Sequence, residues 1–331
     1  KCAEVVSAQM AAGARGITVS TLKEAEYFFT QGIHDILYAV AMAPHKLPQA
    51  LALRRQGCAL TLITASLAAA QAIVDFGQLH GETFAVLIEI DCDGHRSGVK
   101  PQAPLLLEIS RLLHEGGMLA GVLTHAGESY GLDTPEALQA IAEQERARCV
   151  AAAEAIRDAG LPCPQVSVGS TPTALSAVSL EGVTELRAGG YVFFDLVLHN
   201  IGVCRQDELA WSVLSTVIGH QPEKGWIITD SGWMAMSRDR GTQSQKRDFG
   251  YGQVCTETGE VIDGLLLGSA NQEHGVASFS EGSVDVREAF PLGTRLRVLP
   301  NHACATGTQF ERYHALLENG DVQEWQRLRG W

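Results

Sequence analysis

Two residues of metal-binding type stand two positions apart near the end of the chain, in PNHACAT (Pro300–Thr306). The segment follows TRLRVL, a run with strand character, and if the strand continued, His302 and Cys304 would point to one side. An imidazole nitrogen and a thiolate together suit a divalent cation, zinc most readily. Two protein ligands would leave positions open for water or substrate. The alternative is a buried cysteine beside a hydrogen-bonded histidine.

Two glycine-containing turns have the composition of a phosphate site. GSTPT (Gly169–Thr173) opens a helix, where backbone N–H groups and hydroxyls form a phosphate cradle. The glycines of AGGY (Ala188–Tyr191) let the backbone approach a ligand closely. In (β/α) barrels the loops after strands seven and eight form the usual phosphate site, and these turns take those places if one strand precedes the chain. The alternative for GSTPT is helix capping by Ser170 or Thr171.

Charged and ring-bearing side chains follow two further predicted strands. Arg96, in DCDGHRSGV, follows TFAVLIEI, and a guanidinium at the carboxyl mouth of a barrel can bind an anionic oxygen. His125 and Tyr130, in THAGESY, follow the next strand, where a structural polar role is the alternative. The stretch Ser237–Arg247 is either a solvated loop or a clamp for an acidic substrate. Its cations are Arg238, Arg240, Lys246 and Arg247.

These side chains need a scaffold that gathers strand ends, and the first two thirds of the chain alternates strand and helix patterns. Seven strands are predicted, from Ile17–Val19 to Thr184–Gly189, with helical stretches between them. This alternation is typical of an α/β fold with parallel strands and right-handed crossovers. The chain opens on a helical pattern, Cys2–Ala12, so we expect a (β/α)8 TIM-like barrel whose first strand lies upstream of Lys1.

The pattern changes near Cys204 to short alternating runs separated by glycines, which predicts a mostly antiparallel β domain. One of the predicted strands is GSVDVREAF (Gly282–Phe290). We therefore expect a barrel domain over residues 1–203 and a β-rich domain over residues 204–331 that carries the metal site.

Composition excludes several classes of protein. The 331 residues carry a formal net charge of −13, with 25 Lys and Arg against 38 Asp and Glu, so the chain has no surplus for a basic face that binds nucleic acid or anionic membranes. No signal-peptide pattern opens the given sequence, and no apolar run approaches the roughly 18 residues of a spanning helix. Eight cysteines without a CxxC pair predict reduced thiols and a cytoplasmic protein.

Taken together, the segments resemble the D-serine dehydratase and D-threonine aldolase group of pyridoxal-phosphate enzymes, which have fold type III and an alanine racemase-like barrel. Within the group, the chain is most similar to dehydratases that act on D-threo-3-hydroxyaspartate. The resemblance implies a homodimer. The matching segments cover nearly the whole chain: DCDGHRSGV, THAGESY, GSTPT, RAGGYVFFD, DSGWMAMSRDRG, NQEHG and PNHACAT.

The resemblance also implies roles for individual residues. Lys1 is similar to the last lysine of an H-x-K-x-H-K segment, which implies that the Schiff-base lysine lies a few residues upstream of Lys1. Arg96 would contact the phenolic oxygen of the cofactor, Tyr130 its pyridine ring, and His302 with Cys304 would bind the catalytic metal. The implied phosphate contacts are Gly169, Ser170, Thr171, Gly190 and Tyr191.

The implied activity is elimination of water from a D-β-hydroxy amino acid, with pyridoxal phosphate as electron sink and a divalent metal (Zn, Mn, Mg or Co) assisting departure of the hydroxyl. Many aldolases of the group carry Asp where this chain has Cys304, which favours the dehydratases. The alternatives are a D-threonine-type aldolase, a racemase, which needs no metal, and a non-catalytic pyridoxal-phosphate carrier, which lacks a second β domain.

The expected substrate follows from charge. D-threo-3-hydroxyaspartate carries a second carboxylate, whose burial needs a cationic or metal partner, and D-serine does not. The four cations of Ser237–Arg247 and the metal could supply that partner in this acidic chain. We therefore expect conversion of D-threo-3-hydroxyaspartate to oxaloacetate and ammonia, in preference to conversion of D-serine to pyruvate and ammonia.

Overall fold

A computed structural model describes residues 1–282 and 284–329 of the chain. Internal contacts divide it into two compact units. The first holds Lys1–Ser129, Leu138–Ala188 and the chain from Arg312 onward, and the second holds Tyr130–Ala137 and Gly189–Glu311. The predicted border between two independently folding domains, at residues 203 and 204, stays a prediction.

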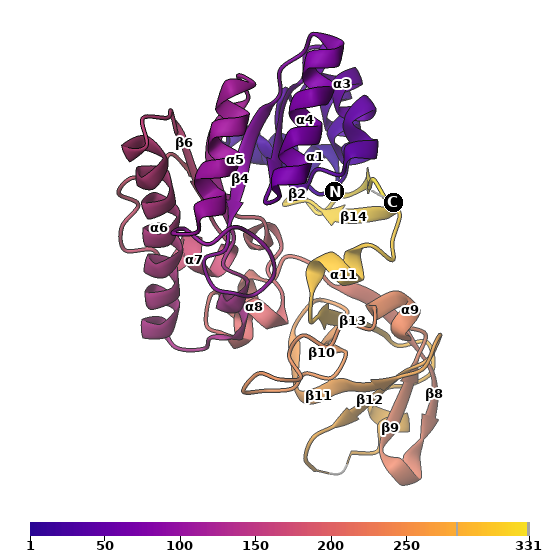
Figure 1. Ribbon diagram of the computed structural model, residues 1–331. Helices are drawn as coiled ribbons and strands as arrows, with labels where there is room; N and C mark the ends of the chain where they lie inside the picture. Colours follow the sequence, from indigo (N-terminus) through magenta and orange to yellow (C-terminus); the bar gives the residue numbers. More distant parts are fainter. Residues whose placement is uncertain (283, 330–331) are drawn as a thin grey trace. The chain divides into compact units, whose positions relative to one another are not determined.

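The first unit is built on a seven-stranded parallel sheet in which strands follow one another in chain order (Figure 1). This confirms the seven predicted strands and the predicted α/β class. Sequential order with helical crossovers is the arrangement of a curled, barrel-like sheet. The strands are β1 (Ile17–Val19), β2 (Asp35–Ala41), β3 (Ala59–Thr64), β4 (Ala85–Ile90), β5 (Leu119–Thr124), β6 (Gln165–Val168) and β7 (Glu185–Leu186).

Successive strand positions are apolar because both faces of this sheet are buried. Leu37, Ile63, Leu87 and Leu123 form a cluster of their own on one face. Alternate residues such as Ile88 belong to the larger core, which includes the helices. The carboxyl ends of these strands are thereby fixed at one edge, where the candidate cofactor residues lie.

The helices of the first unit cover the sheet, and α4 and α5 lie side by side against it (Figure 1). The Ser66 side chain accepts a hydrogen bond from Ala69 N at the start of α4, and Gly81, at φ 63°, ends it. The helices are α1 (Ala3–Ala11), α2 (Leu22–Thr30), α3 (Leu47–Arg55), α4 (Leu67–His80), α5 (Pro104–Glu115), α6 (Pro135–Asp158) and α7 (Thr171–Ser176).

A C-terminal hairpin also belongs to the first unit by its contacts. Its strands, β14 (Arg312–Leu316) and β15 (Val322–Gln326), are antiparallel. Leu328 N donates a hydrogen bond of 2.8 Å to Lys1 O, which ties the chain after the hairpin to the start of the sequence.

The second unit contains a closed antiparallel barrel with the strand order β10-β11-β12-β9-β8-β13. It confirms the predicted β-rich region. Val213, Ser215 and Val217 are buried at alternate positions of β8, as expected for a strand with one face inside a barrel. The strands are β8 (Val213–Gln221), β9 (Trp226–Thr229), β10 (Gly252–Thr256), β11 (Val261–Ala270), β12 (Gly275–Phe279) and β13 (Arg295–Pro300), and the short helices are α8 (Leu196–Asn200), α9 (Trp233–Met236), α10 (Val286–Ala289) and α11 (Ala303–Gly307).

The predicted strand over Gly282–Phe290 is wrong. Residue 283 lies outside the described residues, and Val286–Ala289 forms the helix α10. The Asp285 carboxylate accepts hydrogen bonds from the N–H groups of Arg287 and Glu288, which favours a helical turn over an extended chain. The barrel strand of this region is β12, from Gly275 to Phe279.

Two further expectations bear on the class of protein. Among residues 1–282 and 284–329, no helix is long and apolar enough to cross a membrane. All eight cysteines lie within the described chain and none is in a disulfide; seven are buried and Cys304 is exposed. This arrangement fits the predicted reduced thiols.

Candidate active site

The loop after β6 is closed on itself by hydrogen bonds. Ser170 is the N-cap of α7: its hydroxyl accepts from Thr173 N at 3.2 Å, and Ser170 N donates to the Thr173 hydroxyl at 3.0 Å. The hydroxyls of Ser129 and Ser170 are also hydrogen-bonded, at 3.0 Å. Ser170 therefore caps helix α7, as the alternative interpretation predicted. These hydrogen bonds hold Gly169–Thr173 in one buried conformation.

Gly169 is required by a close approach of two strands. Its φ is 141°, and a Cβ built on it would lie 1.9 Å from Arg187 O. Gly169 N donates to Glu145 Oε1 at 3.2 Å, and Gly169 O accepts from Nδ1 of His125 at 3.0 Å. Helix α6, through Glu145, and the segment after β5, through His125, therefore fix the backbone of the predicted phosphate loop.

Three titratable groups lie around this loop, of which Glu145 is buried and His125 and Arg187 are half-buried. Burial raises the pKa of Glu145, whose carboxylate also accepts a hydrogen bond from Ala126 N at 2.9 Å. Burial lowers the pKa of His125, so its imidazole is neutral and donates from Nδ1. The guanidinium of Arg187 donates to the Ser167 hydroxyl at 2.8 Å and to Thr124 O. An acidic and a basic side chain thus stand beside this loop, and hydrogen bonds hold both.

Sequence reasoning missed Glu145 and Arg187, although a signal existed for each. Glu145 occupies the buried stripe of α6, in which Leu138, Ala142 and Cys149 are also buried. A carboxylate at that spacing is in the core and needs partners there. Arg187 directly precedes the AGGY turn, in which the glycines were predicted to approach the ligand.

Arg96 lies in the loop after β4, at the same edge of the sheet as Gly169. Its side chain is 60% exposed, and its guanidinium is 3.6 Å from the Glu89 carboxylate. The Asp91 carboxylate closes this loop by accepting from Gly94 N at 2.6 Å. The structure thus brings Arg96, His125 and Gly169–Thr171 to the carboxyl ends of neighbouring parallel strands.

The remaining predicted cofactor residues belong to the second unit. Tyr130 O accepts from the Gln245 side chain at 3.1 Å, and its side chain packs on the cluster around Leu198. Gly190 begins a 3₁₀ turn, and Tyr191 in that turn is 40% exposed. Their contact with the cofactor stays a prediction.

His302 and Cys304 come together by a different geometry from the predicted one. Strand β13 ends at Pro300, and His302 is the N-cap of α11, so the expectation of a continuing strand is wrong. The chain turns because Ala303 N donates to the buried Asp195 carboxylate, at 3.0 Å. The two side chains are nevertheless hydrogen-bonded to each other.

The carboxylate of Asp239 also contacts His302. Nδ1 of His302 donates to Oδ2 of Asp239 at 2.6 Å. The Asp239 contact first, and then the Cys304 contact, raise the pKa of His302 to about 10, and the same hydrogen bond lowers the pKa of Asp239. Asp239 was missed because it stands among the cations of Ser237–Arg247, which drew attention to positive charge only.

The donor set fits a divalent cation with open coordination positions. Imidazole nitrogen and thiol sulfur are suitable ligands, and Cys304 is exposed. Over the described residues, no group of three or more His, Cys, Asp or Glu side chains could hold a metal ion.

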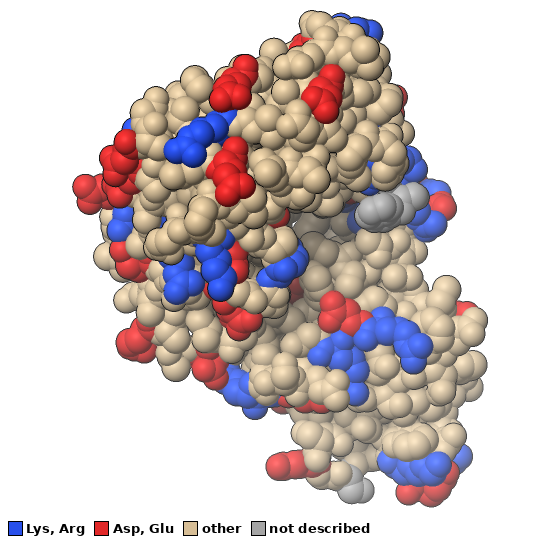
Figure 2. All heavy atoms as spheres, viewed as in Figure 1, with Lys and Arg blue, Asp and Glu red and all other residues tan. Residues whose placement is uncertain are grey.

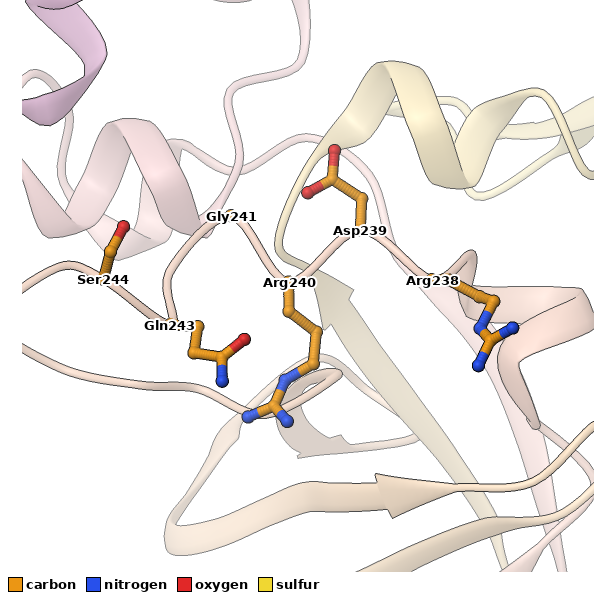
Figure 3. A pocket seen from close by; sticks show the side chains of 6 residues that line it. All are labelled: Arg238, Asp239, Arg240, Gly241, Gln243 and Ser244. Atoms are coloured by element: carbon orange, nitrogen blue, oxygen red, sulfur yellow. The ribbon is translucent and has the colours of Figure 1, made fainter.

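A hollow of about 510 Å³ opens beside Asp239 in the second unit (Figure 3). It is lined by Arg238, Asp239, Arg240, Gly241, Gln243 and Ser244.

The cations of this loop differ in their partners. Arg240 is paired with Asp248 at 2.6 Å, and Arg247 stacks on Phe249 at 4.4 Å. Arg238 lies 5.0 Å from the centre of the Trp233 ring, and among the described residues no carboxylate pairs with it.

Comparison with known proteins defines the class. The alanine racemase N-terminal domain family matches residues 1–197, and the putative serine dehydratase domain family matches residues 210–316. The chain therefore belongs to the family that joins an alanine racemase-like barrel to a serine dehydratase domain, and the predicted resemblance is confirmed.

The most similar relatives can be named. D-threo-3-hydroxyaspartate dehydratase from Delftia sp. (strain HT23) is 68% identical over 335 residues, which cover 100% of this chain and 88% of the relative. A solved structure of that protein has a TM-score of 0.98 at 67% identity and covers 100% of this chain and 88% of that one. D-serine dehydratase of Dictyostelium discoideum is 29% identical and covers 93% of this chain and 80% of the relative.

Two further structures are variants of the dehydratase, at 67% identity and TM-scores of 0.99 and 0.98, covering 100% of this chain and 86% and 88% of those chains. In one a histidine is replaced by alanine; in the other, a cysteine two positions later is replaced, and that variant is in the metal-free form.

Proposed function

We propose that this protein is a pyridoxal-phosphate- and divalent-metal-dependent dehydratase that removes water from D-threo-3-hydroxyaspartate to give oxaloacetate and ammonia. D-serine, giving pyruvate and ammonia, is the second substrate. The observation that carries the proposal is 68% identity to a D-threo-3-hydroxyaspartate dehydratase over the entire chain. The His302–Cys304 pair adds the chemistry that the reaction needs.

The cofactor would be held at the carboxyl edge of the parallel sheet. Arg96 would contact its phenolic oxygen and Tyr130 its pyridine ring. The rigid, buried turn after β6 suits a phosphate because its small residues let an anion approach backbone and hydroxyl groups. The residues proposed to hold the phosphate are Gly169, Ser170, Thr171, Gly190 and Tyr191.

The lysine that would carry the cofactor was predicted upstream of Lys1, and it stays a prediction. The Nζ atom of Lys1 itself lies 2.9 Å from the carboxylate of Glu24, whose side chain is only 6% exposed. That ion pair supports a structural role for Lys1.

His302 and Cys304 would hold the metal. When bound, pyridoxal phosphate supplies an electron sink at Cα, and a Zn, Mn, Mg or Co ion supplies a Lewis acid for the β-hydroxyl. The protein's part is to present one imidazole nitrogen and one thiolate at an exposed position that substrate can reach. The spacing of the two residues replaced in the variants of the Delftia relative supports this assignment.

Substrate preference would come from a cation that is not already paired. Arg238 fits this role better than Arg240, which is paired with Asp248, and it differs from Lys246 and Arg247 in lining the hollow beside Asp239. Arg238 also lines the same hollow as Asp239, which contacts the metal-binding histidine. A guanidinium there would bind the second carboxylate of hydroxyaspartate, which D-serine lacks.

Product analysis with and without a chelator tests the proposal. D-threo-3-hydroxyaspartate should yield equal amounts of oxaloacetate and ammonia, and removal of metal should stop the reaction. Glycine and glyoxylate as products would instead identify an aldolase. Inversion at Cα that survives the chelator would identify a racemase.

The remaining expectations concern partners and location. We propose a homodimer in the cytoplasm that binds a small D-amino acid and neither nucleic acid nor membrane. Acidic and basic side chains are interspersed on the face drawn in Figure 2, and the net charge of −13 supports the same view. Mass photometry tests the dimer, and limited proteolysis tests the predicted border at residues 203 and 204.

A further inference from the structure

The Asp239 carboxylate has a direct effect on the form of His302. A neutral imidazole carries its proton on one of two nitrogens, and an ionised carboxylate can only accept a hydrogen bond. The 2.6 Å contact between Nδ1 and Oδ2 therefore places the proton on Nδ1. Nδ1 keeps this proton whether or not the imidazole is charged, and a metal would bind at Nε2, displacing any proton there.

The loop that carries Asp239 is fastened to α11 independently of this contact. The Thr306 hydroxyl, in α11, donates to Met236 O at 2.7 Å. Between Met236 and Asp239, Ser237 has a φ of 67°, a conformation that costs a non-glycine residue energy. Asp239 N then donates to the Ser237 hydroxyl at 3.2 Å. The backbone is thus bent to deliver this carboxylate to His302.

The backbone of His302 is fixed from the other side. Asn301 accepts from the Thr242 hydroxyl at 2.9 Å and donates to Gly250 O at 2.6 Å. Asp195 accepts from Ala303 N at 3.0 Å. Since the residues before and after His302 are held, the main remaining freedom is rotation of the imidazole, and the Asp239 contact removes it.

Asp239 is not engaged by the cations beside it. Figure 3 shows its carboxylate pointing away from the guanidinium groups of Arg238 and Arg240. Those groups lie against Trp233 and Asp248. The Asp239 side chain is 37% exposed and that of His302 is 43% exposed, so the pair contributes little to folding stability.

We propose that Asp239 is the positioning residue that orients His302 and selects its metal-binding form. This inference rests on the proposed function, because it requires His302 to be a metal ligand. Partners of this kind typically change metal affinity by about 10- to 100-fold.

Metal affinity, measured on holoenzyme stripped of metal, tests the role without using activity. Zn²⁺ is titrated against a fluorescent chelator for the wild type and four variants: Asp239→Ala, Asp239→Asn, His302→Ala and Asp248→Ala. Asp248 is the matched control, because it pairs with Arg240 in the same loop and does not contact His302. Thermal unfolding and cofactor absorbance report whether each variant is intact.

Asp239→Asn carries the decisive information, because the amide has the shape of the carboxylate. The neutral amide offers Nδ1 either a weaker acceptor, its oxygen, or a donor, its N–H, which would move the proton to Nε2, whereas a purely steric role would be preserved. We expect both Asp239 variants to bind Zn²⁺ about 10- to 100-fold more weakly. Asp248→Ala should stay within about twofold.

Three outcomes would overturn the inference. Near-normal affinity in Asp239→Asn with loss in His302→Ala leaves the metal site standing and removes the role of Asp239. Loss in Asp239→Ala alone means that the side chain only fills space. Unchanged affinity in His302→Ala overturns the metal assignment itself, and with it the proposed function.

Discussion

The turn at Gly169–Thr173 and the pair His302–Cys304 represent two ways of building a site. The turn is buried and its polar groups bond to one another, as in the Ser170–Thr173 capping box. In the pair, the His302 side chain is 43% exposed and Cys304 is exposed, and their positions depend on carboxylates from distant parts of the chain.

This difference predicts which substitutions should affect folding and which should affect only the metal and the reaction. A buried, close-packed turn contributes to folding, so substitutions there should affect both the fold and the cofactor. An exposed pair contributes little to folding, so substitutions there should remove metal and activity while the protein stays folded.

The largest effect is expected for His302→Ala and Cys304→Ala. Loss of a Lewis acid removes several kcal/mol of transition-state stabilisation, so dehydratase activity should fall by about 10²- to 10⁴-fold. Unfolding free energy and cofactor absorbance should remain near wild type. Activity retained by either variant, with an unchanged metal content, would refute the metal assignment.

A large effect on folding is expected for Gly169→Ala. The new Cβ would lie 1.9 Å from Arg187 O at a φ of 141°. Unfolding in urea should show a loss of roughly 2–4 kcal/mol. Gly131→Ala is the control, because no atom lies within 4 Å of its Cβ position. Equal unfolding free energies of the two variants would mean that the turn at Gly169 is not rigid.

The same contrast explains what sequence reasoning could predict. The parallel strands and the GSTPT turn were predictable because their signals are local: apolar runs, a glycine and a helix cap. Gly282–Phe290 was misjudged because its alternating pattern fits a strand, while the Asp285 cap decides for a helix. The contact of Asp239 with His302 spans 63 residues, and no local pattern encodes it.

A smaller, selective effect is expected for Arg238→Gln. Loss of one charge-assisted carboxylate contact should lower kcat/KM for D-threo-3-hydroxyaspartate by about 10- to 150-fold, or 1.5–3 kcal/mol, with D-serine little changed. Arg240→Gln, Arg247→Gln and Lys246→Gln are the matched variants. If all four treat the two substrates alike, the loop is a solvated surface and the metal sets the preference.

The smallest effect concerns thiol reactivity. Cys304 is exposed and the other seven cysteines are buried, so iodoacetamide should label one thiol per chain rapidly. Bound Zn²⁺ should slow that labelling by about tenfold, because the thiolate would be engaged. Peptide mapping identifies the site, and Cys304→Ala should lose the rapid phase. Labelling unaffected by metal would place the metal elsewhere.

The central claim is that His302 and Cys304 hold the catalytic metal. Anomalous diffraction at the absorption edge of the bound metal, from crystals of the holoenzyme, tests it most directly. We expect the strongest peak about 2.0–2.3 Å from both the imidazole Nε2 of His302 and the Sγ of Cys304. A strongest peak on other residues, with neither of these two within coordination distance, would contradict the account.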